Sequence, residues 1–156
     1  MTDSHADLDQ ATTGRHVREL EALYRIAGLL ATDQPQRQML ADVLDVLDSG
    51  CGMQRGTITL VSPDRSELLI EVAHNLSEPQ RQAVRYRLGE GITGRVVEIG
   101  KPAVIPKVSQ EPEFLDRVHE RRKREPREMS FICVPIAIGP EVVGALSADR
   151  PYEEDV

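Results

Sequence analysis

A glycine-rich segment at residues 89–94, with the sequence GEGITG, has the spacing G-x-G-x-x-G. This spacing is typical of loops that hold the pyrophosphate of a dinucleotide, after a buried strand and inside a βαβ unit. The preceding residues 85–88, RYRL, are amphipathic and charged, and no parallel βαβ order follows, so we reject dinucleotide binding. Two interpretations remain. Either a helix N-terminus binds an anion here, or the glycines pack the loop against a sheet, which is the favoured reading.

The other side chains that could act in catalysis or bind a metal do not form a catalytic or metal-binding pattern. Cys51 and Cys133 lie far apart in sequence, and neither has a C-x-x-C neighbour, so a zinc or iron–sulfur site within one chain lacks ligands. Cys133 lies within an apolar run, where a cysteine usually behaves as a small buried hydrophobe. The four histidines are scattered, and none forms a nucleophile–base pair with a serine. We therefore expect binding, not turnover.

A basic run at residues 117–127 contains six Lys and Arg residues, with Glu120 and Glu125 among them. It is interpreted as a solvated helix face or as a contact surface for an acidic partner. Direct nucleic-acid binding is not expected, because the net charge is −7 and aromatic residues make up only 3%. No apolar run reaches the roughly 20 residues of a membrane span, and residues 1–14 are polar and acidic. A cytoplasmic protein without membrane contact is expected.

Hydrophobic periodicity predicts the elements that position these residues. Residues 1–14 are expected to form a disordered tail, and residues 15–156 a single domain. Helices are predicted over 15–30 and over about 35–47, the second ended by Gly50. Strands follow at 57–61 and 68–74, joined by a turn at 63–66. Further helices are predicted at 77–84, 92–99 and 112–124, and further strands at 103–105, 130–138 and 142–148. This order indicates an α+β fold with an antiparallel sheet.

Three segments together resemble a GAF domain. They are the hairpin, the sequence GEGITGRV at residues 89–96, and the closing pair SFICVPI at 130–136 and VGALSADR at 143–150. The resemblance covers about residues 15–151 and implies a central antiparallel sheet with helices on both faces. It also implies a further C-terminal helix, which is truncated here. The sequences LEALYRIA at 20–27, REPREMSFICVPI at 124–136 and LSADR at 146–150 are similar to the N-terminal sensory domain of NifA-type nitrogen-fixation activators.

This resemblance implies a regulatory domain that controls an AAA+ ATPase and a helix-turn-helix DNA-binding domain, neither of which this chain contains. Some relatives respond to 2-oxoglutarate, whose carboxylates need cationic or N–H donors. Candidate pocket residues are Arg85, Arg87, Thr93, Arg95, Lys107, Ser130 and Cys133, although any one arginine is expected to form only a surface ion pair. Two alternatives remain. One is a protein-interaction module that receives an anti-activator protein. The other, ranked far lower, is reduction of methionine sulfoxide by Cys51 and Cys133. A homodimer through the helix at 15–30 is also expected, from its apolar face.

Overall fold

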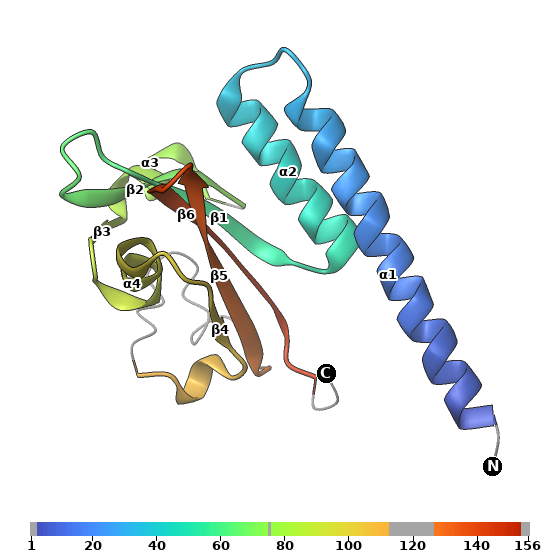
Figure 1. Cartoon of the computed structure of the whole chain (residues 1–156). Helices are drawn as coiled ribbons and strands as arrows, with labels where there is room; N and C mark the ends of the chain where they lie inside the picture. The colour runs from blue at the N-terminus through green and yellow to red at the C-terminus, as the bar shows by residue number, and fades with distance from the viewer. Residues whose placement is uncertain (1–2, 75, 113–126, 154–156) are drawn as a thin grey trace. The chain divides into compact units, whose positions relative to one another are not determined.

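The computed structural model describes residues 3–74, 76–112 and 127–153 and divides the chain into two units, Met1–Met53 and Gln54–Val156 (Figure 1). Each unit is described by itself. All but the first residue of the helix expected at 112–124, and all but the last residue of the basic run at 117–127, lie outside the described residues. None of the helices in the described ranges is long and apolar enough to cross a membrane.

The first unit is a pair of helices, α1 (Asp3–Leu30) and α2 (Gln36–Cys51). Helix α1 begins at Asp3, which differs from the expected disordered tail over residues 1–14. Acidic residues near its start suit a helix N-terminus, and neither proline nor glycine interrupts residues 3–13. Among the residues of α1 whose burial is described, Ala22 is the buried one, and a Cβ built on Gly50 of α2 would lie 3.1 Å from the Ala22 Cβ. Gly50 therefore permits close helix packing.

Helix α2 ends at Cys51 and not at the expected Gly50. Its C-cap is Gly52, which has a φ of 66° and donates its N–H to the Asp48 carbonyl oxygen at 3.0 Å. This left-handed conformation is easy for glycine and costly for most other residues. The sequence contains two glycines in this region, and only the backbone geometry distinguishes the packing glycine from the capping one.

The second unit is built on a six-stranded sheet in the order β3-β2-β1-β6-β5-β4. Its strands are β1 (Gln54–Val61), β2 (Glu67–Ala73), β3 (Arg85–Arg87), β4 (Ala103–Ile105), β5 (Met129–Ile138) and β6 (Glu141–Pro151). Every pair of neighbouring strands is antiparallel. The expected α+β class and antiparallel sheet are confirmed, as are the β1–β2 and β5–β6 hairpins.

Both edges of this sheet are short. Strand β3 was not expected from the sequence, and strand β4 matches its expected bounds; each has three residues. Pro102 and Pro106 flank β4, and prolines have no N–H to donate to a neighbouring strand. Short strands thus occupy both edges, and the strand order places the long strands β1, β5 and β6 inside the sheet.

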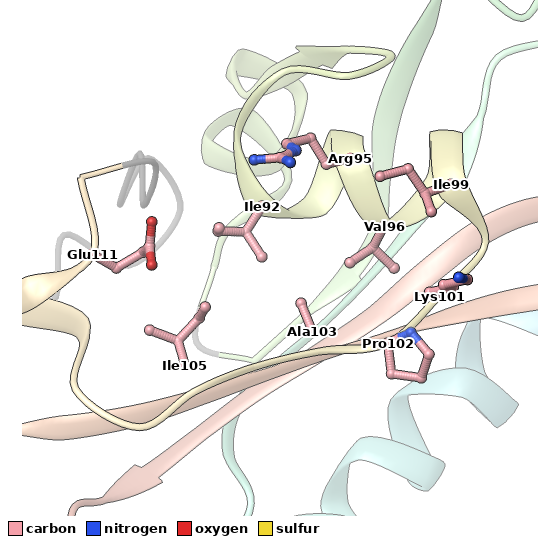
Figure 2. A pocket seen from close by; sticks show the side chains of 9 residues that line it. All are labelled: Ile92, Arg95, Val96, Ile99, Lys101, Pro102, Ala103, Ile105 and Glu111. Atoms are coloured by element: carbon pink, nitrogen blue, oxygen red, sulfur yellow. The ribbon is translucent and has the colours of Figure 1, made fainter.

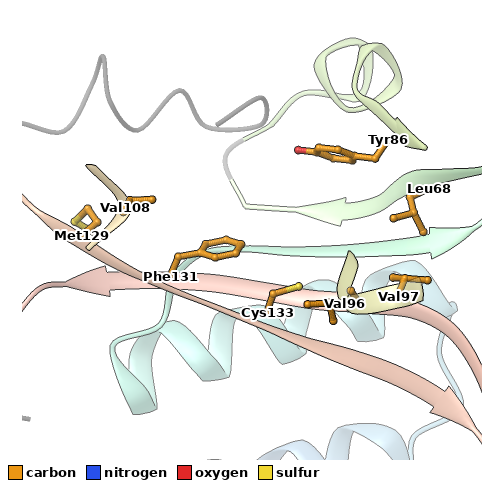
Figure 3. Close-up of a cluster of buried hydrophobic side chains, with 9 residues drawn as sticks. Leu68, Tyr86, Val96, Val97, Val108, Met129, Phe131 and Cys133 are labelled. Carbon is orange, nitrogen blue, oxygen red and sulfur yellow. The ribbon is translucent and has the colours of Figure 1, made fainter. Parts of the chain in front are cut away.

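The described residues of the second unit also form two α-helices and a short 3₁₀ helix: α3 (Glu78–Ala83), α4 (Gly91–Ile99) and η1 (Val108–Gln110). Ser77 caps α3 through a capping box with Gln80. Helix α4 packs on β5 and β6. The core beneath it contains Leu68, Tyr86, Val96, Val97, Val108, Met129, Phe131, Cys133 and Ala145 (Figure 3). This core fixes α4, and with it the residues that face the neighbouring strand β4.

Candidate ligand-binding site

The glycine-rich segment forms a tight loop into α4. Gly89 has a φ of 81°, and its N–H donates to the Gly94 carbonyl oxygen at 3.0 Å. A Cβ on Gly94 would lie 2.7 Å from the Arg87 carbonyl oxygen, which is too close for any larger residue. The loop and the first turn of α4 are therefore in direct backbone contact. This geometry agrees with the favoured interpretation, in which the glycines serve packing.

The start of α4 carries a carboxylate of its own. Glu90 is the N-cap residue, and its Oε2 accepts a hydrogen bond from the Arg87 backbone N–H at 2.9 Å. A negative side chain at this position interacts favourably with the helix dipole. It also opposes a second anion at the same place, so the helix start offers little support for anion binding.

A cavity of about 360 Å³ opens between one side of α4 and strand β4 (Figure 2). Its volume is in the range of small-molecule sites. Most of its lining is apolar, and three charged side chains complete it. The lining residues are Ile92, Arg95, Val96, Ile99, Lys101, Pro102, Ala103, Ile105 and Glu111.

The charges of this cavity are separated along its length. Figure 2 shows Glu111 toward one end of the cavity and Lys101 toward the other, with Arg95 on α4 above the apolar side chains of Ile92, Val96 and Ala103. The two cations outnumber the single carboxylate, so the lining favours a ligand of net negative charge. Two cations beside an apolar wall suit a short carbon chain that carries more than one anionic group.

Two of the expected site residues meet below α4. Cys133 is fully buried on β5, and Thr93 in the first turn of α4 hydrogen-bonds to it. Burial raises the pKa of the Cys133 thiol to about 12, and the hydrogen bond with Thr93 offsets only part of this rise. The thiol is therefore protonated at neutral pH, and a protonated thiol is a poor nucleophile.

Lys107 and Ser130 make contacts beyond the end of β4. The Lys107 Nζ lies 4.9 Å from the centroid of the Tyr152 ring, a cation–π arrangement. The Ser130 hydroxyl donates to the Pro106 carbonyl oxygen at 2.7 Å. Neither residue lines the cavity, and both contacts hold the chain that follows β4 against β5 and the end of β6.

Arg85 and Arg87 lie on the edge strand β3, on the side away from the core. Tyr86 between them is buried, so the alternation of the strand leaves both arginines exposed. The Arg85 Nη1 lies 2.9 Å from Glu67 Oε1 in a surface ion pair. These two arginines line a second, mostly polar pocket of about 490 Å³ with Glu67, Tyr86 and Glu90, distinct from the cavity at β4. Of the seven expected residues, Arg95 alone lines that cavity.

Comparison with known proteins places this arrangement in a family. The family model described as "GAF domain" matches residues 36–155. The chain belongs to the GAF domain family. The fold has a TM-score of 0.78 to the crystal structure of an A. aeolicus nlh2 GAF domain in an inactive state, which agrees with this assignment. The two chains are 26% identical, and the match covers 90% of this chain and 83% of the other.

This GAF domain is similar to Nif-specific regulatory proteins. It is 36% identical over 136 residues to the one from Azospirillum lipoferum, which covers 87% of this chain and 22% of the relative. It is 38% identical over 142 residues to the one from Azotobacter vinelandii, which covers 88% of this chain and 26% of the relative. The chain thus spans about a quarter of the length of these relatives.

Two charged residues of the GAF domain cavity, Lys101 and Glu111, were not identified from the sequence. Lys101 follows Gly100, the C-cap of α4, and Glu111 is the C-cap of η1. Both lie in connecting segments without periodicity, where charged residues are ordinary. Their roles depend on β4 lying against α4, which is a tertiary feature. The one available signal was their nearness in sequence to the apolar residues of β4.

Proposed function

We propose that this GAF domain is the regulatory domain of a transcriptional activator of nitrogen-fixation genes and that it binds a small metabolite in the cavity between α4 and β4. The observation that carries the proposal is the lining of the cavity, in which the two cations Arg95 and Lys101 stand beside an apolar wall. The similarity to Nif-specific regulatory proteins supports the regulatory role. The buried, protonated Cys133 thiol favours binding over catalysis.

The ligand that fits this lining is a short dicarboxylate such as 2-oxoglutarate. One carboxylate contacts Arg95, the other contacts Lys101, and the carbon chain lies along Val96 and Ala103. Charge-assisted hydrogen bonds of this kind are stronger than neutral ones. Glu111 disfavours a third negative group at its own end of the cavity, so the cavity discriminates against more highly charged anions.

Ligand binding acts by shifting a population. A ligand favours one conformation only to the extent that it binds that conformation more tightly. In the proposed mechanism the ligand fixes α4 against β4, and this state is read by the ATPase domain of the longer protein. By linkage, the free energy by which the ligand favours this state equals the free energy by which this state favours ligand binding.

Isothermal titration of the 156-residue chain with 2-oxoglutarate tests the proposal, with succinate and a cyclic nucleotide as comparison ligands. We expect saturable binding that Arg95→Ala and Lys101→Ala each weaken about tenfold or more. Arg85→Ala is the matched control, because it removes an arginine from the surface of the same unit outside the cavity. The Arg85→Ala variant should bind 2-oxoglutarate with the same affinity as the unchanged chain.

Binding that Arg85→Ala weakens as much as Arg95→Ala would place the site elsewhere and contradict the proposal. The absence of binding by all three ligands, in a sample shown to be folded by circular dichroism, would favour the alternative function. In that case the domain acts as an interaction module that receives an anti-activator protein, and the search for partners replaces the search for ligands.

A further inference from the structure

Residues 106–111, which we call the strap, follow strand β4 and contact two separate parts of the second unit. Glu111, the last residue of the strap, lines the cavity, as does Ile105, which comes directly before the strap. Other residues of the strap contact the start of β5 and the residue that follows β6. One short segment therefore touches both the proposed ligand site and the place where the chain leaves the sheet.

Hydrogen bonds attach the strap to the start of β5. The Ser130 hydroxyl donates to the Pro106 carbonyl oxygen at 2.7 Å. The Ser109 backbone N–H donates to Oε1 of Glu128 at 3.2 Å, and the Ser109 hydroxyl donates to the other carboxylate oxygen. The bond from this hydroxyl is the largest cause of the lowered pKa of Glu128. The carboxylate is thus ionised at neutral pH and accepts charge-assisted hydrogen bonds.

The middle of the strap is packed and internally hydrogen-bonded. Val108 is 3% exposed and belongs to the same core cluster as Met129 (Figure 3). The Gln110 N–H donates to the Lys107 carbonyl oxygen at 3.2 Å. The Glu111 N–H donates to the Val108 carbonyl oxygen, also at 3.2 Å. Closely packed segments move as units and do not deform continuously, so a displacement of Glu111 also displaces Lys107.

Tyr152 follows the end of β6 and is held by the same group of residues. Its N–H donates to the Glu128 carbonyl oxygen at 2.9 Å. The Lys107 Nζ lies 4.9 Å from the centroid of its ring, within the range of an attractive cation–π contact. Glu128 thus contacts the strap through its carboxylate and Tyr152 through its backbone. A displacement of Lys107 therefore changes the surroundings of the Tyr152 ring.

We propose that an anionic ligand in the cavity displaces the strap by repelling Glu111, and that this displacement loosens the contact between Lys107 and Tyr152. The inference rests on the proposed function, because it needs a ligand of net negative charge in that cavity. Like charges repel each other more strongly in a cavity that partly excludes water than in bulk solvent. The ligand thus binds more tightly to a conformation in which Glu111 is farther away, and this difference in affinity shifts the population.

The size of the coupling is limited by the contact that is loosened. Because coupling is reciprocal, loss of the contact between Lys107 and Tyr152 should raise the affinity for the ligand. The rise should be no more than about fivefold, which corresponds to a cation–π contact at a partly exposed site. The surroundings of residue 152 are therefore a more sensitive measure of the coupling than the affinity is.

Tryptophan fluorescence can report on residue 152 alone, because the chain contains no tryptophan. Tyr152→Trp keeps the contact with Lys107, since tryptophan is the best cation–π partner. We expect 2-oxoglutarate to change the emission of this variant saturably, with the midpoint that isothermal titration gives for the same variant. Arg95→Ala in this background should shift both midpoints by the same factor, which ties the fluorescence change to the cavity.

Two further substitutions in the Tyr152→Trp background test the strap. Glu111→Gln removes the repulsion, so it should bind 2-oxoglutarate more tightly and lose at least half of the fluorescence change. Lys107→Met should give, without ligand, an emission close to that of the ligand-saturated protein, and ligand should change it little. If Lys107→Met does not fold, Ser109→Ala detaches the strap from Glu128 and should also reduce the change.

Each substitution has a matched control. Glu141→Gln removes a carboxylate that is exposed on the same unit outside the cavity, and Arg150→Met removes a cation two residues from the fluorescent position. Both controls should keep the affinity and the fluorescence change. A heat of binding without a fluorescence change, or a full change in Glu111→Gln, would overturn the inference and leave the proposed function intact. The absence of any heat of binding would contradict the proposed function, and the inference would fall with it.

Discussion

The Arg55 guanidinium Nη1 lies 3.1 Å from Oδ2 of Asp149, a carboxylate whose side chain is fully buried. Arg55 is on β1, at an irregularity between Gln54 and Thr57 in the pairing with β6, and it has a φ of 51°. Few residues other than glycine adopt this backbone conformation. The acidic residue of the closing segment LSADR is thus held by a cation that is 94 positions away in the sequence.

Removal of this cation is predicted to destabilise the domain strongly. Arg55→Met takes away the positive charge and leaves the buried Asp149 carboxylate behind, and loss of one member of a buried ion pair costs about 3–5 kcal/mol. The free energy of unfolding from urea denaturation measures the effect.

Arg65→Met is the matched control for this variant. Arg65 also has a positive φ, of 59°, and its Nη1 lies 2.9 Å from Glu141 Oε1 in an ion pair whose side chains are both exposed. The backbone contribution is therefore similar, and the expected loss is at most about 1 kcal/mol. Equal losses in the two variants would show that the buried pair is not what stabilises β1 against β6.

Gly94→Ala is predicted to destabilise the second unit by about 2 kcal/mol or more. The new Cβ would lie 2.7 Å from the Arg87 carbonyl oxygen and 3.1 Å from backbone atoms of Gly89, so the loop must move. Gly28→Ala on α1 meets nothing within 4 Å and should stabilise its helix by about 0.5–1 kcal/mol. Thermal unfolding followed by circular dichroism compares the two, and a neutral Gly94→Ala would contradict the packing role of the motif.

Asp64 is predicted to make stability depend on pH in the acid range. Hydrogen bonds from Ser66 and Ser62 lower the pKa of this carboxyl from 3.8 to about 2. A carboxyl with a lowered pKa in the folded state stabilises that state above the unfolded pKa, and this contribution is lost as the pH falls from about 4 to about 2. Asp64→Asn should therefore flatten the dependence of the urea midpoint on pH in this window. An unchanged slope would show that these hydrogen bonds do not persist in solution.

The two cysteines are predicted to differ in reactivity. Cys133 is fully buried with a pKa raised to about 12, whereas Cys51 is half-buried. In a Cys51→Ser variant, a thiol-reactive disulfide reagent at neutral pH should react with Cys133 no faster than the domain unfolds. Rapid reaction of that variant under native conditions would contradict the burial and reopen a redox role for Cys133.

The sequence predicted those parts of the fold that depend on local patterns. Alternation over residues 57–61 and the turn residues at 63–66 identified the first hairpin, and the apolar run around Cys133 identified a buried strand. Strand β3 was missed, because three residues with charged ends carry too little periodicity to register. The boundary at Gly52 was missed, because two nearby glycines offer the same local signal.

The candidate site was predictable only in part. Arg95 was identified because it follows a recognisable motif, whereas Lys101 and Glu111 lie in segments whose proximity is set by the pairing of β4 with β5. Arg85 and Arg87 were attractive as cations near the glycines, yet the strand alternation that buries Tyr86 turns both of them outward. A cavity is a property of the folded surface, and single-sequence patterns describe only one element at a time.

The short edges of the sheet restrict how copies of this domain can associate. An unpaired edge strand presents free N–H and C=O groups, and a long one is a template on which another chain can add a strand. Here β3 and β4 have three residues each, and prolines stand on both sides of β4. Continuous growth of the sheet from one molecule into the next is thus disfavoured on either side. Assembly must then rely on side-chain surfaces, which makes the association specific and guards the domain against fibril-like aggregation.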